Sequence, residues 1–177
     1  MGEGHELLKK LTENGHNIQN HSISHQNLVN IPISERDAFL ESDIKKQKKT
    51  LESYGNENYA FAFPFGSFDG DWEIRLLKVF KKIRRFGTEN NNPYYYDSID
   101  YSSRRIIAAS TIDNRMFNSD EMFYDYCNGV FKSLQNKDQI VCIVCHDIGD
   151  RDYAITLDRL DWFVSQCKTF GIAFIKI

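Results

Sequence analysis

The amino-acid sequence predicts an α/β fold built around a parallel sheet that is either open or closed into a barrel. Short apolar runs alternate with longer segments of helical periodicity along the 177 residues. The apolar runs do not alternate with polar residues, which is typical of strands that are covered on both faces. We therefore expect residues 1–177 to form a single domain with a sizeable core.

Five helices are predicted from the spacing of apolar residues and from capping residues. They cover residues 6–14, 35–54, 71–83, 120–134 and 157–170. The predicted N-cap residues are Ser34, Ser119 and Thr156. Glycine, the preferred residue at a helix C-terminus, follows three of these helices, as Gly15, Gly55 and Gly171.

Six short strands are predicted between these helices. They cover residues 17–21, 59–63, 86–88, 105–109, 139–145 and 172–175. The segment 89–103 is polar and rich in asparagine and tyrosine. We expect this segment to be an exposed loop, which is either a binding loop or a variable surface.

Composition and charge exclude several classes of function. The net charge of −3 argues against a nucleic-acid surface, because binding to phosphates requires a basic excess. No apolar stretch approaches the roughly 18 residues that a membrane span needs. The four cysteines are expected to be reduced and to fill space in the core. They are Cys127, Cys142, Cys145 and Cys167.

A histidine-rich stretch gives the first indication of chemistry. His21 and His25 stand four residues apart, so a helical turn or a tight loop could direct both imidazoles at one point. Neutral imidazole is the commonest metal ligand in proteins. A pair of this kind on an exposed helix is more often simply solvated. A metal site would also need a third ligand, often a carboxylate, and an open position for water.

Polar residues follow three of the predicted strands. His21 and His25 follow the first strand, Pro64 to Asp69 follow the second, and His146 with Asp147 follow the strand near the end of the chain. Functional sites of parallel α/β folds form at the C-terminal ends of the strands. We therefore expect the three segments to meet at one rim of the sheet.

These three segments resemble known motifs in both order and spacing. The motifs are His21 to His25 (His-Ser-Ile-Ser-His), Phe63 to Gly66 (Phe-Pro-Phe-Gly) and Val144 to Asp147 (Val-Cys-His-Asp). Together they resemble the polysaccharide deacetylases, carbohydrate esterase family 4. The resemblance implies a distorted (β/α) barrel. It also implies metal-dependent removal of N- or O-acetyl groups from a polysaccharide with acetylated sugars.

The resemblance assigns the early residues to metal binding and to the oxyanion. His21 and His25 would be ligands of a divalent metal, usually zinc. Phe65, between Pro64 and Gly66, would lend its backbone N–H to the oxyanion. Such a preformed donor stabilises the tetrahedral intermediate of acyl transfer.

The late motif would supply the proton. By resemblance, His146 is the general acid that protonates the leaving amine, which is a role suited to imidazole. Asp147 would support it, and Val144 takes the position of a residue that lines the acetyl pocket.

One family motif has no counterpart. The family's first strand carries an Asp-Asp pair that supplies a metal ligand and the catalytic base, and no such pair occurs in this chain. We therefore expect a barrel that is truncated at its N-terminus and lacks its first strand. The chain would be a fragment, a short paralogue that binds glycans or is structural, or a deacetylase completed by Asp69 or Asp147. A sheet edge left open there predicts a homodimer.

Overall fold

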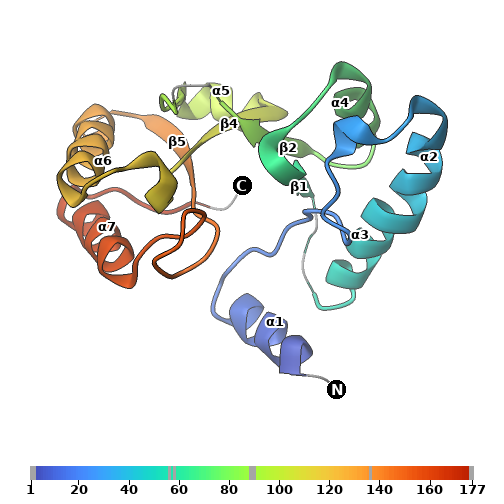
Figure 1. Cartoon of the computed structure of the whole chain (residues 1–177), viewed down its shortest axis with the longest axis horizontal. Helices are drawn as coiled ribbons and strands as arrows, with labels where there is room; N and C mark the ends of the chain where they lie inside the picture. Colours follow the sequence, from blue (N-terminus) through green and yellow to red (C-terminus); the bar gives the residue numbers. More distant parts are fainter. Residues whose placement is uncertain (1–2, 56, 58, 88–90, 136, 176–177) are drawn as a thin grey trace. The chain divides into compact units, whose positions relative to one another are not determined.

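The computed structural model of the chain describes residues 3–55, 57, 59–87, 91–135 and 137–175 (Figure 1). The described residues fall into two compact units. The first contains residues up to 85 together with 105–107, and the second contains residues 86–104 and 108–175. Within the described residues five strands form an open sheet in the order β1-β2-β4-β5-β3. The predicted α/β class is therefore confirmed.

The first unit consists mainly of helices packed on two parallel strands. Its helices are α1 (Glu3–Glu13), α2 (Arg36–Phe39), α3 (Lys45–Glu52) and α4 (Gly70–Leu77). Its strands are β1 (Ala60–Ala62) and the larger part of β2 (Lys82–Phe86). Short 3-10 turns cover Leu28–Asn30, Ile33–Glu35 and Pro64–Gly66. The core is aromatic, and Phe61, Phe63 and Trp72 are almost completely buried in it.

A π-helical turn, Leu40–Ile44, joins α2 to α3. Figure 1 shows these segments as one continuous coil. The sequence predicts a regular helix over residues 35–54 with Ser34 as its N-cap, and this prediction is wrong in two respects. The coil begins as a 3-10 turn directly after Pro32, and no side chain caps it there. The π turn then inserts one residue more than an α-helical turn holds.

The second unit contains two long helices and three strands. The strands are β3 (Tyr95–Asp97), the larger part of β4 (Ile106–Thr111) and β5 (Gln139–Val144). The helices are α5 (Ser98–Ser103), α6 (Asp120–Leu134) and α7 (Leu157–Thr169), and a 3-10 turn covers Asn114–Met116. β4 runs parallel to β5, whereas β3 runs antiparallel to it. The α6–α7 layer packs through Phe123, Phe131 and Phe163.

The predicted caps of the second unit are confirmed. Ser119 accepts a hydrogen bond from the N–H of Met122 and begins α6. Thr156 accepts one from the N–H of Arg159 and begins α7. Each cap satisfies a backbone donor that the helix itself leaves unpaired.

Three further predicted segments, besides the helix over 35–54, differ from the structure. The predicted strand at 17–21 is reduced to one bridge between Asn20 and Phe61, and residues 172–175 are not a strand. The helix predicted for 71–83 ends at Leu77, because its last residues belong to β2. Residue 88 of the third predicted strand and residues 89–90 of the predicted loop lie outside the described residues.

The tyrosine-rich segment is structural rather than a loop. Residues 95–97 form β3, which pairs with β5, and 98–103 form α5. Tyr96 is buried, and its hydroxyl accepts the N–H of Ala108 at 2.8 Å. The tyrosines thus take part in sheet pairing and core packing, which the polar composition of the segment does not predict.

The cysteines agree with their predicted role only in part. All four thiols are free, as expected, and Cys127 and Cys167 are buried, but Cys142 is half-buried and Cys145 is exposed, so the predicted core position is wrong for Cys145, which lies directly after β5. Burial raises the pKa of the Cys127 thiol to about 12, which keeps it protonated and suits a core position. None of the described helices combines the length and the apolar character that a membrane crossing requires.

Candidate active site

The early histidine loop begins where the chain pairs with β1. The N–H of Asn20 donates to the carbonyl of Ala60, and the N–H of Ala62 donates to the carbonyl of Asn20. His21 is therefore the first residue beyond the C-terminal end of a strand-like pairing, as the sequence predicts. This is the end of a parallel sheet at which sites form.

Two buried or half-buried amides hold the start of the loop. Asn20 is fully buried; its amide donates to the carbonyl of Ile44 at 3.0 Å and accepts the N–H of Ser22 at 3.1 Å. Gln47 accepts the N–H of His21 and donates to the carbonyl of Ser22. The backbone on both sides of His21 is thereby anchored to α3 and to the π turn before it.

The centre of the loop is held by a carboxylate. Asp43, which is 8% exposed, accepts the N–H of Ile23 at 2.8 Å and that of Ser24 at 3.0 Å. Asp43 lies in the π turn Leu40–Ile44. A buried carboxylate is stabilised by such paired backbone donors, so the loop and the turn depend on each other.

The loop backbone is tightly wound. Ser22 and His25 have positive φ values of 68° and 51°, which are uncommon for residues with a side chain. The hydroxyl of Ser22 accepts the N–H of His25 at 3.1 Å, and so fixes the second histidine relative to the first. Strain of this kind persists only where the surrounding contacts determine the conformation.

The two imidazoles of the loop face each other through one nitrogen each. Nδ1 of His21 lies 2.8 Å from the carbonyl oxygen of Ala62, and it must be the donor because a carbonyl only accepts. The lone pair of His21 is therefore on Nε2, which lies 3.2 Å from Nε2 of His25. Two nitrogen ligands of one tetrahedral zinc ion lie about 3.3 Å apart. The pair thus fits two positions of a metal shell.

The described part of the chain brings no third ligand to this pair. No group of three or more His, Cys, Asp or Glu side chains with metal-binding geometry occurs among the described residues. Asp69, a candidate third ligand, is held by Arg36 through both carboxylate oxygens and also caps α4 at the N–H of Trp72. The Arg36 guanidinium lowers the pKa of the Asp69 carboxyl. Asp69 therefore serves the scaffold.

The turn after β1 lies beside the second histidine. Pro64–Gly66 is a 3-10 turn in which Phe65 has φ 58° and ψ 4°, and Pro64 and Gly66 are buried. The Phe65 side chain is 61% exposed, and its ring centroid lies 4.9 Å from that of His25. The left-handed conformation at Phe65 directs its peptide group differently from a continued strand. The predicted oxyanion role of the Phe65 N–H stays a prediction.

The late histidine, in the second unit, is held by a carboxylate that the sequence analysis missed. Nδ1 of His146 lies 2.5 Å from Oδ2 of Asp113, and the backbone N–H of His146 donates to Oδ1 of the same residue at 3.0 Å. The Asp113 side chain is 2% exposed, whereas that of His146 is 39% exposed. Thr111 donates its hydroxyl to Oδ2 of Asp113 at 2.6 Å.

Asp113 could have been found by the rule that identified the other residues. It follows β4 as His146 follows β5, and these two strands are parallel neighbours. The C-terminal ends of neighbouring parallel strands bring such residues together. The predicted strand over 105–109 ended too early for Asp113 to stand out.

The remaining predicted residues of the late motif lie around His146. Asp147 is exposed, pairs with Arg151 and accepts the N–H of Ile148 at 2.8 Å. Val144 is the last residue of β5, is half-buried, and pairs with Thr111 of β4. The supporting role of Asp147 and the place of Val144 in an acetyl pocket stay predictions, as does the convergence of the three motifs on one rim.

Comparison with known proteins agrees with the early motifs. No curated protein sequence matches the chain. The model of the polysaccharide deacetylase family matches residues 1–82, a range that contains the histidine loop and the Phe65 turn. The resemblance inferred from the motifs is thus confirmed over residues 1–82, where the chain is similar to the polysaccharide deacetylase family.

Proposed function

We propose that this protein is a metal-dependent carbohydrate deacetylase that hydrolyses N- or O-acetyl groups of a polysaccharide. The observation that carries the proposal is the pair of Nε2 atoms of His21 and His25, 3.2 Å apart and oriented by the Nδ1 contact of His21. The family match over residues 1–82 supports the reaction class.

The two imidazoles would hold the metal, for which zinc is the best candidate. Zinc takes imidazole nitrogen readily and, in catalytic sites, keeps one position open for water. When bound, such an ion polarises the acetyl carbonyl and lowers the pKa of its water. His21 and His25 supply two ligands, and the proposal requires one further protein ligand, a carboxylate in the family.

The other residues act on the acetyl group and on the leaving group. The N–H of Phe65 would donate to the oxygen of the acetyl carbonyl as negative charge develops there. His146 would act as the imidazolium, protonated on both nitrogens, and would transfer the Nε2 proton to the sugar nitrogen or oxygen as its bond to the acetyl carbon breaks. Asp113 orients the ring, because its carboxylate accepts the hydrogen bond from Nδ1 and leaves Nε2 as the nitrogen that gives up its proton. The products are acetate and the free amine or hydroxyl.

We also propose the distorted (β/α) barrel of this family as the fold. Two observations support it: β1 pairs with β2 in parallel, and β4 pairs with β5 in parallel. Helix α4 connects the first pair and α6 connects the second, as in βαβ units.

The test combines metal analysis with acetate release. The purified chain is expected to bind about one zinc ion and to release acetate from chitin oligomers, and His21→Ala is expected to lose both. His16→Ala is the matched control, because His16 is exposed and lies outside the facing pair. A chain that binds zinc and oligomers but releases no acetate would contradict the enzymatic proposal and favour a glycan-binding protein.

A further inference from the structure

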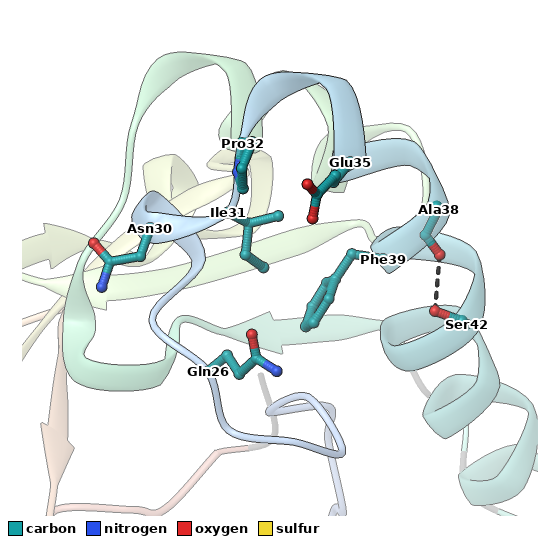
Figure 2. Close-up of a pocket in the computed structure, with 8 residues that line it drawn as sticks. All are labelled: Gln26, Asn30, Ile31, Pro32, Glu35, Ala38, Phe39 and Ser42. Carbon is teal, nitrogen blue, oxygen red and sulfur yellow. Dashed lines mark hydrogen bonds between the residues drawn. The ribbon is translucent and has the colours of Figure 1, made fainter.

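A pocket of about 390 Å³ lies beside the histidine loop in the first unit (Figure 2). Its lining comes from the segment after His25, the 3-10 turns Leu28–Asn30 and Ile33–Glu35, helix α2 and the π turn that follows it. The residues are Gln26, Asn30, Ile31, Pro32, Glu35, Ala38, Phe39 and Ser42. The volume is at the lower end of the range for small-molecule sites, which suits one ring-sized group.

The lining combines an aromatic face with polar groups that are available for binding. Figure 2 shows the ring of Phe39 at the centre of the pocket and the amide of Gln26 below it. Within the part of the chain that the structure describes, no group bonds to the side chains of Gln26, Asn30 or Glu35. Two amides and one carboxylate supply both donors and acceptors.

The pocket wall is held rigidly from behind. Arg36, which is 5% exposed, donates to the carbonyl of Ile31 and binds Asp69 and Asp71. The ring of Phe39 packs edge-on against Trp72, with centroids 6.2 Å apart. A preformed wall lowers the entropy that a ligand must lose on binding.

The pocket is also tied to the proposed metal site through the chain itself. Gln26 directly follows His25. Ser42 lines the pocket, and the next residue, Asp43, holds the histidine loop through Ile23 and Ser24. The π turn therefore contributes to both sites with adjacent residues.

We propose that this pocket binds one sugar ring of the polysaccharide, adjacent in the glycan to the unit that carries the reacting acetyl group. The inference rests on the proposed function. A pyranose has an apolar face that packs on an aromatic ring and a rim of hydroxyl groups that both donate and accept. Phe39 supplies the ring, and Gln26, Asn30 and Glu35 supply partners for hydroxyls.

The test measures affinity for N-acetylglucosamine and its tetrasaccharide by calorimetry, together with KM for acetate release. The double variant Asn30→Ala with Glu35→Gln is expected to raise the Kd and KM of the tetrasaccharide about tenfold, because two hydrogen bonds are lost. The Kd of the monosaccharide and the zinc content are expected to stay at the wild-type values. Ser34→Ala is the matched control, since Ser34 is exposed and lies outside the lining.

The outcomes separate the two proposals. An unchanged tetrasaccharide Kd in the double variant, with acetate release intact, overturns the sugar site and leaves the deacetylase function standing. A weakened tetrasaccharide Kd in a protein that releases no acetate overturns the enzymatic function and supports the sugar site. Equal loss of monosaccharide and tetrasaccharide binding also contradicts a site for a neighbouring unit. Phe39→Leu, which removes the ring and keeps the volume apolar, is expected to weaken tetrasaccharide binding in the same way.

Discussion

The early and the late histidines are oriented in the same way but by partners of different charge. His21 directs Nδ1 at the main-chain carbonyl of Ala62, whereas His146 directs Nδ1 at the carboxylate of Asp113. In both histidines, the role that we propose belongs to the other ring nitrogen, Nε2. A neutral partner fixes the tautomer without adding charge, which suits a lone-pair donor to a metal. A carboxylate makes a charge-assisted bond, which suits a ring that passes protons.

The two regions also differ in how much structure they need. The early loop requires Asn20, Asp43 and Gln47 and two residues with positive φ. The late histidine is held at its backbone N–H and its ring by one residue, Asp113. The comparison indicates that the proposed pair of metal ligands depends on a shaped backbone, whereas the proposed general acid depends on one well-placed carboxylate.

The largest expected effect comes from removing one imidazole of the pair. We expect His21→Ala to lower acetate release at least about 10³-fold, because metal catalysis contributes several kcal/mol to transition-state stabilisation. Zinc content measured by atomic emission is expected to fall in parallel. If this variant kept full zinc binding, the early pair would not be the metal site, and the proposed difference between the early and late histidines would be wrong.

Removing the late imidazole should act on the rate alone. We expect His146→Ala to lower kcat for acetate release by about 10²–10⁴-fold, as is typical when a general acid is lost, with zinc content unchanged. Asp113→Asn is expected to fall between this variant and the wild type, because the ring keeps a hydrogen-bond partner without charge. Loss of zinc in either variant would contradict the division of roles.

The carboxylate under the early loop should affect stability and metal affinity together. Asp43→Ala leaves the N–H groups of Ile23 and Ser24 without their acceptor, so we expect a loss of about 1–3 kcal/mol in the free energy of unfolding by urea. Zinc affinity is expected to drop about 10–100-fold, as for other residues that orient ligands. Glu41→Ala is the control, because Glu41 is exposed and pairs with Lys45 rather than with the histidine loop among the described residues. Equal effects of the two variants would argue against an anchoring role.

We expect the smallest effect, a change in stability alone, at Asp69, a carboxylate that belongs to neither histidine site. Arg36 lowers the pKa of Asp69 below its ordinary value of 3.8, so the folded state holds the ionised form more strongly than the unfolded state does. The stabilisation is present above about pH 4 and is lost as the pH falls through the folded-state pKa. Asp69→Asn should therefore lose stability at neutral pH and show a weaker acid dependence in thermal melts. Zinc content should stay unchanged.

Local signals predicted the structure where the interaction is local. Ser119 and Thr156 cap their helices through a bond to the third residue along, which a short window of sequence contains. The two histidine motifs were likewise recognised from residues close in sequence. The family match over residues 1–82 confirms the resemblance that the early motifs suggested.

The parts that were missed depend on contacts between distant residues. Asp43 meets Ile23 and Ser24 across about twenty residues, and the π turn that presents it leaves no mark in apolar spacing. Tyr96 belongs to the core because its strand, β3, pairs with β5, and β5 follows later in the chain, after helix α6. Tertiary pairing of this kind overrides local propensity.

The π turn makes the spacing of this region sensitive to a single residue. One helical position corresponds to a rotation of about 100°, so deleting one residue between Leu40 and Ile44 would restore a plain α-helix and turn everything beyond it by that angle. Helix content would hardly change, yet Phe39 and Asp43 would no longer point to their present neighbours. In a homologue with an uninterrupted helix here, Asp43 could not hold the histidine loop in the same way. The extra residue of the π turn can therefore be used to identify the relatives that share this arrangement.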